Sequence, residues 1–245
     1  MTHTCLGLIP FLFVLCIGFT GCRSTIELVS VQAVGNIQID GSPVEWEGRL
    51  TRFKSPAVSM GVRNTEEHLF LCLTTADPAI QTQILFAGLT VRFESSGEMV
   101  PFAIQYPLRQ DQPVRPRAPG EGLEVIFGAF APHLHTLQIV RESDRQMFSV
   151  LDVPGIQVRI GMANSVLTYE LQVPLIQAPY YAVPSPDGIL TVTFETTSVD
   201  RFLPGAGSSR PEGRKRERST SSSAADLPVK GDPFRFVVNV VLFSK

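Results

Sequence analysis

The chain has 245 residues, 18% of them charged, and a formal net charge of −2 at pH 7. A nucleic-acid-binding protein needs a basic face for the phosphates, so this weak net charge argues against that class, and we expect no nucleic-acid partner. The length suits one large β domain or two small ones, and a chain of this size buries roughly 70% of its unfolded surface without needing disulfides.

The N-terminus has the pattern of an export signal. From Leu6 to Phe19 the chain is apolar or small and carries no charge. As a helix this stretch would span about 21 Å, which is too short for a hydrocarbon core of roughly 30 Å. The pattern is typical of a signal peptide rather than a membrane-spanning helix, and we expect residues 1–21 to be removed.

The end of this segment, Phe19-Thr20-Gly21-Cys22, resembles the lipobox of bacterial lipoproteins, in which small residues precede an obligatory cysteine. The resemblance implies cleavage before Cys22, a diacyl group on Cys22 and an acylated new N-terminus, with palmitate as a typical chain. Two or more acyl chains hold a protein firmly at a bilayer. Arg23 follows the cysteine instead of the Asp that retains such proteins at the inner membrane, so the resemblance implies the outer membrane. Plain secretion is the alternative.

Cysteine use agrees with this interpretation. Cys5 and Cys16 lie in the predicted signal and Cys22 at its end, so the mature chain keeps one thiol and can form no intramolecular disulfide. That thiol, Cys72, lies in the apolar run 69–73. We expect it to be a small buried hydrophobic residue and not a reactive group.

After a predicted tether over residues 22–34, the chain has the pattern of short strands separated by Gly, Pro and Asn. This spacing predicts an all-β fold, a single antiparallel β-sandwich of jelly-roll type over residues 35–245. A short helix is predicted at 79–86, and 123–130 fits either a helix or a strand. The predicted strand segments are 37–40, 68–75, 88–94, 100–106, 156–160, 166–173, 189–195 and 234–243.

Two stretches interrupt the strand pattern. Residues 108–122 carry three prolines among charges and predict a long surface loop, and residues 204–226 are rich in Gly, Ser and Arg and predict a disordered insertion before the last strand. Loop closure costs only about 0.6 kcal/mol more per doubling of length, so one sandwich tolerates the insertion. Its basic run at 210–218 is interpreted as solvated; a patch touching anionic lipid or glycan is the alternative.

Several motifs together resemble the family 9 carbohydrate-binding modules and their DOMON-like relatives. Those domains commonly open with Ile-x-Ile-Asp-Gly, a short gap and Glu-Trp, then a Gly-Val-x-Asn turn, a strand that ends in Asp, and a late Tyr-Glu-x-x-x-Pro-Leu strand. The matches here are Ile37-Gln38-Ile39-Asp40-Gly41, Glu45-Trp46, Gly61-Val62-Arg63-Asn64, Leu69-Phe70-Leu71 with Asp77, and Tyr169-Glu170-Leu171-Gln172-Val173-Pro174-Leu175. The resemblance covers about residues 35–243. It implies a β-sandwich that binds sugar ends in some members, haem in others, and nothing known in many.

The candidate ligand-binding residues are three aromatic side chains. Members of that family that grip sugar use a pair of exposed Trp side chains, whereas this chain has one, Trp46, within the opening motif. A Trp at such a place more often fills the end of a sandwich core than faces a sugar. Tyr180 and Tyr181, adjacent in a Pro-rich loop, could stack on a sugar instead; plain loop packing is their alternative role.

Other chemistries find little support. His133-x-His135 has a metal-like spacing, but no Asp, Glu or Cys lies at ligand spacing beside it, so both are interpreted as surface histidines. The chain has no Gly-x-Ser-x-Gly nucleophile motif, and its carboxylate pairs, 45/47 and 66/67, fall at turns. We therefore expect neither an enzyme nor a cofactor or metal site.

Two functional hypotheses remain. The first is a lipoprotein of the bacterial envelope, held to the bilayer through acylated Cys22, whose carbohydrate-binding-module-like domain binds a glycan without catalysis. The second is a structural or assembly lipoprotein whose sandwich contacts another envelope protein and binds no small ligand. The family resemblance favours the first, and the single Trp favours the second.

Overall fold

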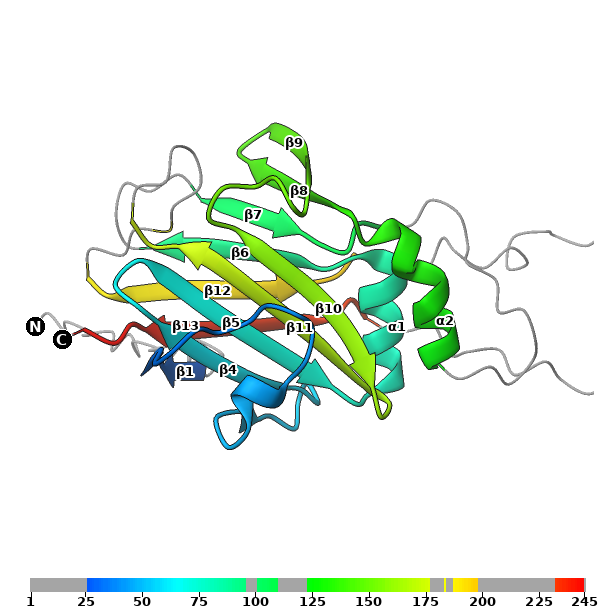
Figure 1. Ribbon diagram of the computed structural model, residues 1–245, viewed down its shortest axis with the longest axis horizontal. Helices are drawn as coiled ribbons and strands as arrows, with labels where there is room; N and C mark the ends of the chain where they lie inside the picture. Colours follow the sequence, from blue (N-terminus) through cyan, green and yellow to red (C-terminus); the bar gives the residue numbers. More distant parts are fainter. Residues whose placement is uncertain are drawn as a thin grey trace, which may run out of the picture.

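The computed structural model describes residues 26–95, 101–109, 123–176, 183, 187–197 and 232–244. Within these ranges two β-sheets pack face to face (Figure 1), so the predicted β-sandwich is confirmed. The predicted signal, Cys22, Tyr180, Tyr181 and the insertion at 204–226 lie outside the described residues.

The seven-stranded sheet places the last two strands of the chain beside the first. Neighbours are antiparallel except for the first pair, β1 and β13, which is parallel. In spatial order the strands are β1 (Ile26–Val29), β13 (Arg235–Val241), β12 (Ile189–Glu195), β6 (Thr90–Ser95), β7 (Phe102–Gln105), β8 (Thr136–Arg141) and β9 (Asp144–Ser149).

The six-stranded sheet contains the longest strands and is likewise antiparallel except at its edge, where β2 runs parallel to β4. Its order is β10 (Gln157–Ala163), β11 (Val166–Pro174), β5 (His68–Thr75), β4 (Ser59–Asn64) and β2 (Val31–Gln32), and β3 (Thr51–Arg52) also pairs with β4.

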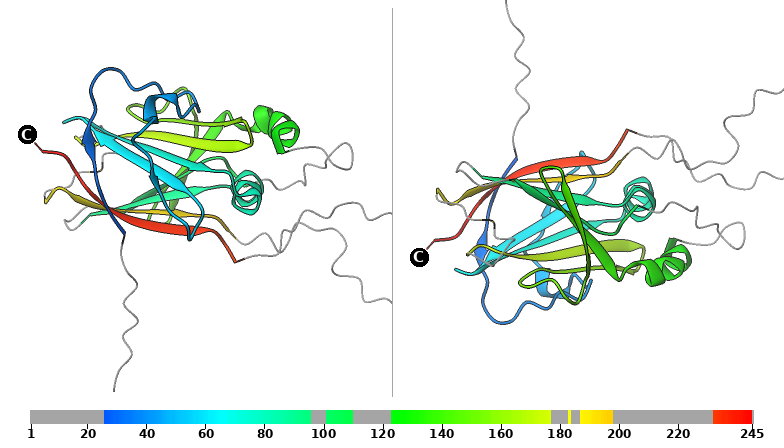
Figure 2. Two further views of the ribbon diagram at one scale, coloured as in Figure 1. Left: turned by 90° about the horizontal axis from the view of Figure 1, so that it is seen from below. Right: turned by 90° about the horizontal axis from the view of Figure 1, so that it is seen from above.

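The two parallel pairings correct the predicted tether over residues 22–34. The chain pairs with β13 in one sheet, crosses at Ser30, and then pairs with β4 in the other. Backbone hydrogen bonds from Ser30 N to Val241 O (2.8 Å) and from Ala33 N to Asn64 O (2.8 Å) hold both sides of the crossing. This segment joins the two sheets along one edge (Figure 2), so the folded domain begins by Ile26.

Two helices cover one end of the sandwich. Helix α1 (Pro78–Ala87) connects β5 to β6 and confirms the predicted helix at 79–86, and the ambiguous segment forms α2 (Leu123–Phe130). Asp77 is the N-cap of α1 because its Oδ1 accepts hydrogen bonds from Ala79 N (2.8 Å) and Ile80 N (3.3 Å), and Pro78 suits the first helical position. Figure 1 shows both helices at the end opposite the C-terminus.

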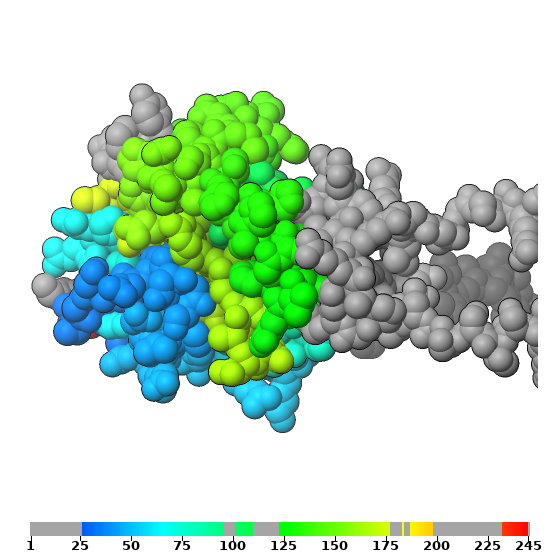
Figure 3. Space-filling model, turned by 45° about the vertical axis from the view of Figure 1, so that its right-hand side comes forward, coloured from blue at the N-terminus to red at the C-terminus, as the bar shows by residue number. Residues whose placement is uncertain are grey.

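The six-stranded sheet is buried on both faces. Its inner face contributes to the main core, where Tyr106, Tyr169, Phe194 and Phe236 follow one another at ring-centroid distances of 6.4 Å. Its outer face is covered by residues 33–50, which build a second core from Ile37, Ile39, Trp46, Phe70 and Cys72. The covering segment is seen in blue in Figure 3.

Two local expectations differ from the structure. Ile37 and Ile39 alternate with exposed residues as predicted, but they lie on the outer face of the six-stranded sheet without joining a strand ladder. The expected Gly-Val-x-Asn turn at 61–64 is instead the end of strand β4. In both cases tertiary packing, and not local pattern, decides which backbone groups are paired.

Candidate functional site

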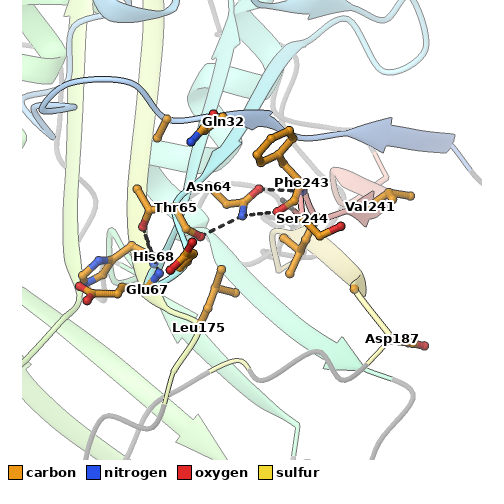
Figure 4. A pocket seen from close by; sticks show the side chains of 14 residues that line it. Gln32, Asn64, Thr65, Glu67, His68, Leu175, Asp187, Val241, Phe243 and Ser244 are labelled. Atoms are coloured by element: carbon orange, nitrogen blue, oxygen red, sulfur yellow. Dashed lines mark hydrogen bonds between the residues drawn. The ribbon is translucent and has the colours of Figure 1, made fainter.

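A cleft of about 1090 Å³ opens at the end of the sandwich opposite the helices; we call it the end cleft (Figure 4). It is formed where strands of both sheets begin or end, so turns and strand ends supply most of its lining. The lining residues are 32–33 at the end of β2, 64–68 from the end of β4 to the start of β5, Leu175 after β11, 187–188 before β12, and 241–244 at the end of β13.

One wall of the end cleft is a hydrogen-bonded bridge between the two sheets, made by Ser30, Asn64 and Phe243. The Asn64 side chain accepts from Phe243 N (2.9 Å) and donates to Phe243 O (3.1 Å), as a strand backbone would. Ser30 Oγ donates to Asn64 Oδ1 and accepts from Phe243 N (3.0 Å). Because Asn64 satisfies both backbone groups of Phe243, the C-terminal end is fixed against the six-stranded sheet.

The floor is the tight turn between β4 and β5. Thr65 Oγ1 accepts hydrogen bonds from Glu67 N (3.2 Å) and His68 N (3.0 Å), a side-chain turn that orders the backbone of both residues. Leu175 N donates to Glu67 O (2.7 Å), which ties the turn to the end of β11. The turn that lines the cleft is therefore fixed by the Thr65 side chain and by a backbone hydrogen bond to the end of β11.

The lining of the end cleft combines polar and apolar residues. Among the described residues it carries Glu66, Glu67, Asp187 and His68 and no Lys or Arg. Its apolar members are Ala33, Leu175, Val241, Leu242 and Phe243, and Phe243 is 39% exposed. Polar groups that can bind hydroxyls, together with apolar surface, are the combination that small-molecule sites use for orientation and contact area.

The family-like motifs converge elsewhere, around the buried side chains of Trp46 and Glu170, in a group that we call the Trp46 cluster: Asp40, Gly41, Trp46, Gly61 and Glu170. Trp46 Nε1 donates to Glu170 Oε1 (2.7 Å), and the backbone N–H groups of Asp40 (3.0 Å) and Gly41 (2.7 Å) donate to Glu170 Oε2. Glu170 and Trp46 are both fully buried. Burial raises the pKa of the Glu170 carboxyl, against the opposing effect of these three hydrogen bonds.

The two glycines of the Trp46 cluster are required by close packing. A Cβ on Gly61 would lie 2.5 Å from Trp46 Cε3, so the indole can lie flat on β4 only if that residue is glycine. Gly41 has a φ of +87°, and a Cβ there would lie 2.8 Å from Gly161 N. The Gly residues of both motifs thus make room for the covering segment.

The structure places the predicted site residues differently. Trp46 has no exposed surface, so its ring offers no face to a sugar, and it is removed from the candidate ligand-binding residues. Tyr180 and Tyr181 lie outside the described residues, between Leu175 and Asp187, both of which line the end cleft. Val183 is buried, and its N–H donates to Pro174 O (2.8 Å).

The structure also places Cys72, the two histidines His133 and His135, and the described helices. Cys72 is fully buried, and desolvation, followed by the charges of Glu170 and Glu45, raises its pKa well above the ordinary value, as expected of a packing residue. His133 and His135 are exposed, and in the described ranges no three His, Cys, Asp or Glu side chains group as metal ligands would. None of the helices described is both long and apolar enough to cross a bilayer.

The sequence pattern missed the residues that line the end cleft. Its lining comes from five separated segments that no local motif joins, and Asn64 was identified only as part of a turn. A sharper signal was present for Glu170, because a carboxylate in the apolar alternation of residues 166–173 must find donors if it faces inward.

Comparisons with known proteins gave weak similarity to solved structures and no match by sequence. No protein-family model matches the chain, and no curated protein matches its sequence. Among solved structures, the chain is similar to a family 9 carbohydrate-binding module from Caldicellulosiruptor kristjanssonii in complex with glucose, with 7% identity, a TM-score of 0.42, and coverage of 89% of this chain and 96% of that one. A complex of such a module from the same organism with cellotriose gives 9% identity, a TM-score of 0.40, and coverage of 89% and 94%. Similarity at this level does not identify a ligand.

Proposed function

We propose that this chain is a non-catalytic glycan-binding lipoprotein of the bacterial envelope, and that the end cleft is its binding site. The observation that carries the proposal is the make-up of this cleft. It has the size of a ligand site, and its described lining combines carboxylates and other hydrogen-bonding groups with apolar residues such as Leu175, Leu242 and Phe243. Sugars need both features, because their hydroxyls seek hydrogen bonds while their C–H faces seek apolar contact.

We propose that Tyr180 and Tyr181 supply the aromatic contact. The described residues on either side of the two tyrosines support this. Leu175 and Asp187 line the end cleft, and the N–H of Val183 donates a hydrogen bond to Pro174 O. Tyr181 is two residues from Val183, a distance of at most about 7 Å along the chain. Trp46 cannot take this role because its indole is buried and its N–H is bound to Glu170.

The membrane anchor in this proposal is Cys22, with the outer membrane as the location. Its support is the lipobox-like segment 19–22 and the uncharged stretch before it. Replacing Cys22 by Ala should leave the protein unprocessed or released from membranes, because acyl chains would then be missing. Intact-mass analysis of membrane-extracted protein tests this directly, and a mature N-terminus other than Cys22 would contradict it.

A glycan array on the soluble chain, residues 23–245, tests the binding function. A glycan that binds in the end cleft should lose affinity at least tenfold in the double variant Tyr180→Ala, Tyr181→Ala, since stacked aromatic contacts supply much of such affinity. The variant should keep the unfolding midpoint of the parent chain. Unchanged affinity in a folded double variant would remove both tyrosines from the site.

One observation favours a second function. The chain's single Trp is buried in the Trp46 cluster, so the paired-Trp clamp of sugar-binding family members has no counterpart here. A structural or assembly lipoprotein that contacts another envelope protein needs no such clamp. If the soluble chain binds no glycan on the array, the glycan proposal fails and this second function stands.

A further inference from the structure

The position of the first strand limits how the protein can sit on a membrane; this inference rests on the proposed anchor at Cys22. Strand β1 begins at Ile26, four residues after Cys22. Four fully extended residues span at most about 14 Å. The β1 edge of the seven-stranded sheet is thus held close to the acylated residue. The opposite edge, β9, lies six strand spacings away, roughly 29 Å across the sheet at about 4.8 Å per strand.

The outer face of this edge carries a row of aliphatic side chains. Val29 lies directly opposite Val241, and Val241 lies directly opposite Ile189, so the three side chains share one face of the sheet. Val29 is 68% exposed, Ile189 is 43% exposed, and Val241 is half-buried. We call these three residues the aliphatic row.

The neighbouring row of side chains on the same face of the sheet is polar. It holds Glu27, Asn239 and Thr191 in the same register; Glu27 is exposed, and Asn239 and Thr191 are half-buried. The polar row is what a solvated sheet face predicts. At the edge nearest the predicted anchor, the exposed side chains of Val29 and Ile189, with half-buried Val241 between them, can therefore be removed from water only by an apolar contact from outside the sheet.

We propose that the aliphatic row rests on the bilayer to which Cys22 is anchored. The anchor keeps the row at high local concentration near the lipid, so a contact too weak to hold a free protein is enough to orient an anchored one. The contact is apolar and not electrostatic, because Glu27 is the charged residue next to the row and the row itself has no basic side chain. Val241 also lines the end cleft, so this orientation brings the end cleft beside the bilayer surface.

Depth-resolved labelling of the full-length, acylated protein in vesicles tests the proposal. A fluorescent label on Val29→Cys or Ile189→Cys is compared with the same label on Met147→Cys. Met147 is 55% exposed on β9, at the far edge. Native Cys72 stays unlabelled in the folded protein because it is fully buried. Each variant is first shown to unfold at the parent's midpoint, and its acyl group is verified by intact mass.

Nitroxide-bearing lipids should quench the labels at 29 and 189 at least threefold more than the label at 147. The difference should persist in neutral phosphatidylcholine vesicles and in high salt, as an apolar contact requires. Equal quenching at all three positions overturns the proposal. So does a difference that is absent at high protein density and appears only when the protein is diluted over more lipid, since this would mean that a second copy covers the row. An unmodified Cys22 overturns the anchor and the bilayer contact together, whereas equal quenching with Cys22 acylated overturns the contact alone.

Discussion

The Trp46 cluster and the end cleft are built from the same kinds of residue and use them in opposite ways. In the cluster, the Glu170 carboxylate is buried and accepts hydrogen bonds from Trp46 and from two backbone N–H groups. In the cleft, Glu66 and Glu67 are exposed at a turn between strands. The cluster uses its polar groups to hold residues 33–50 against the six-stranded sheet, whereas the carboxylates of the cleft lie at the exposed surface.

This difference shows why motif residues are a poor guide to the binding surface here. The Asp-Gly, Glu-Trp and Tyr-Glu motifs are conspicuous in the sequence because each supplies a part of one interior arrangement. The end cleft has no comparable motif, since its residues come from strand ends that only the folded sandwich brings together. Residues that stabilise a fold and residues that could serve a ligand are thus separated in space.

Truncating the indole should have the largest effect on stability. Trp46→Ala empties a fully buried site next to Gly61, so we expect a loss of about 3–5 kcal/mol in the free energy of unfolding. Urea unfolding followed by circular dichroism measures it, since the variant has no Trp fluorescence. Val44→Ala, at a 64% exposed position two residues earlier, should change stability by less than about 0.5 kcal/mol. A loss below about 1 kcal/mol for Trp46→Ala would contradict the assignment of this residue to the core.

The charge of Glu170 should make the stability of the cluster depend on pH. Burial raises the pKa of Glu170 above its ordinary 4.5, so the folded state binds this proton more tightly than the unfolded state. The stability that protonated Glu170 contributes to the folded state is therefore complete below about pH 4.5. It is lost as the pH rises through the folded-state pKa of Glu170.

Glu170→Gln removes this titration and replaces one acceptor oxygen with a donor that faces N–H groups. We expect it to cost about 1.5–3 kcal/mol. The difference in unfolding free energy between parent and variant should narrow as the pH rises above about 4.5. A difference that widens instead would show that the three hydrogen bonds outweigh burial.

Replacing the predicted insertion should have the smallest effect. Glu195 at the end of β12 lies opposite Arg235 at the start of β13, and Thr196 N donates to Phe234 O (2.9 Å), so the two strand ends are already adjacent. Replacing residues 204–226 with a short Gly-Ser turn should keep the thermal midpoint within a few degrees. Loss of cooperative unfolding in that chain would show that the insertion contributes to the core.

Much of the sandwich could be predicted from alternation and turns. The predicted bounds of β5 and β12 match the structure, because both strands are bordered by clear turn residues. Strands β8 and β9 were missed: β9 is exposed along most of its length, and the turn at Glu142 (φ 53°) lacks the Asn-Gly or Asp-Gly that marks a tight hairpin.

The sites were harder to predict than the strands. The burial of Trp46 was expected from its motif, but its pairing with Glu170 joins residues 124 positions apart. The Asn64–Phe243 bridge spans 179 positions. Contacts of this range depend on sheet order, which single-sequence patterns do not contain.

Affinity measured on a variant of the cleft lining tests whether a glycan binds in the end cleft. For a glycan that the array identifies, His68→Ala should weaken binding about tenfold or more, because His68 lines the cleft and its ring packs 6.2 Å from that of Phe70. Met147→Ala, on the far strand β9, should leave the affinity unchanged. Equal affinities for the two folded variants and the parent chain would place the glycan elsewhere and contradict the account.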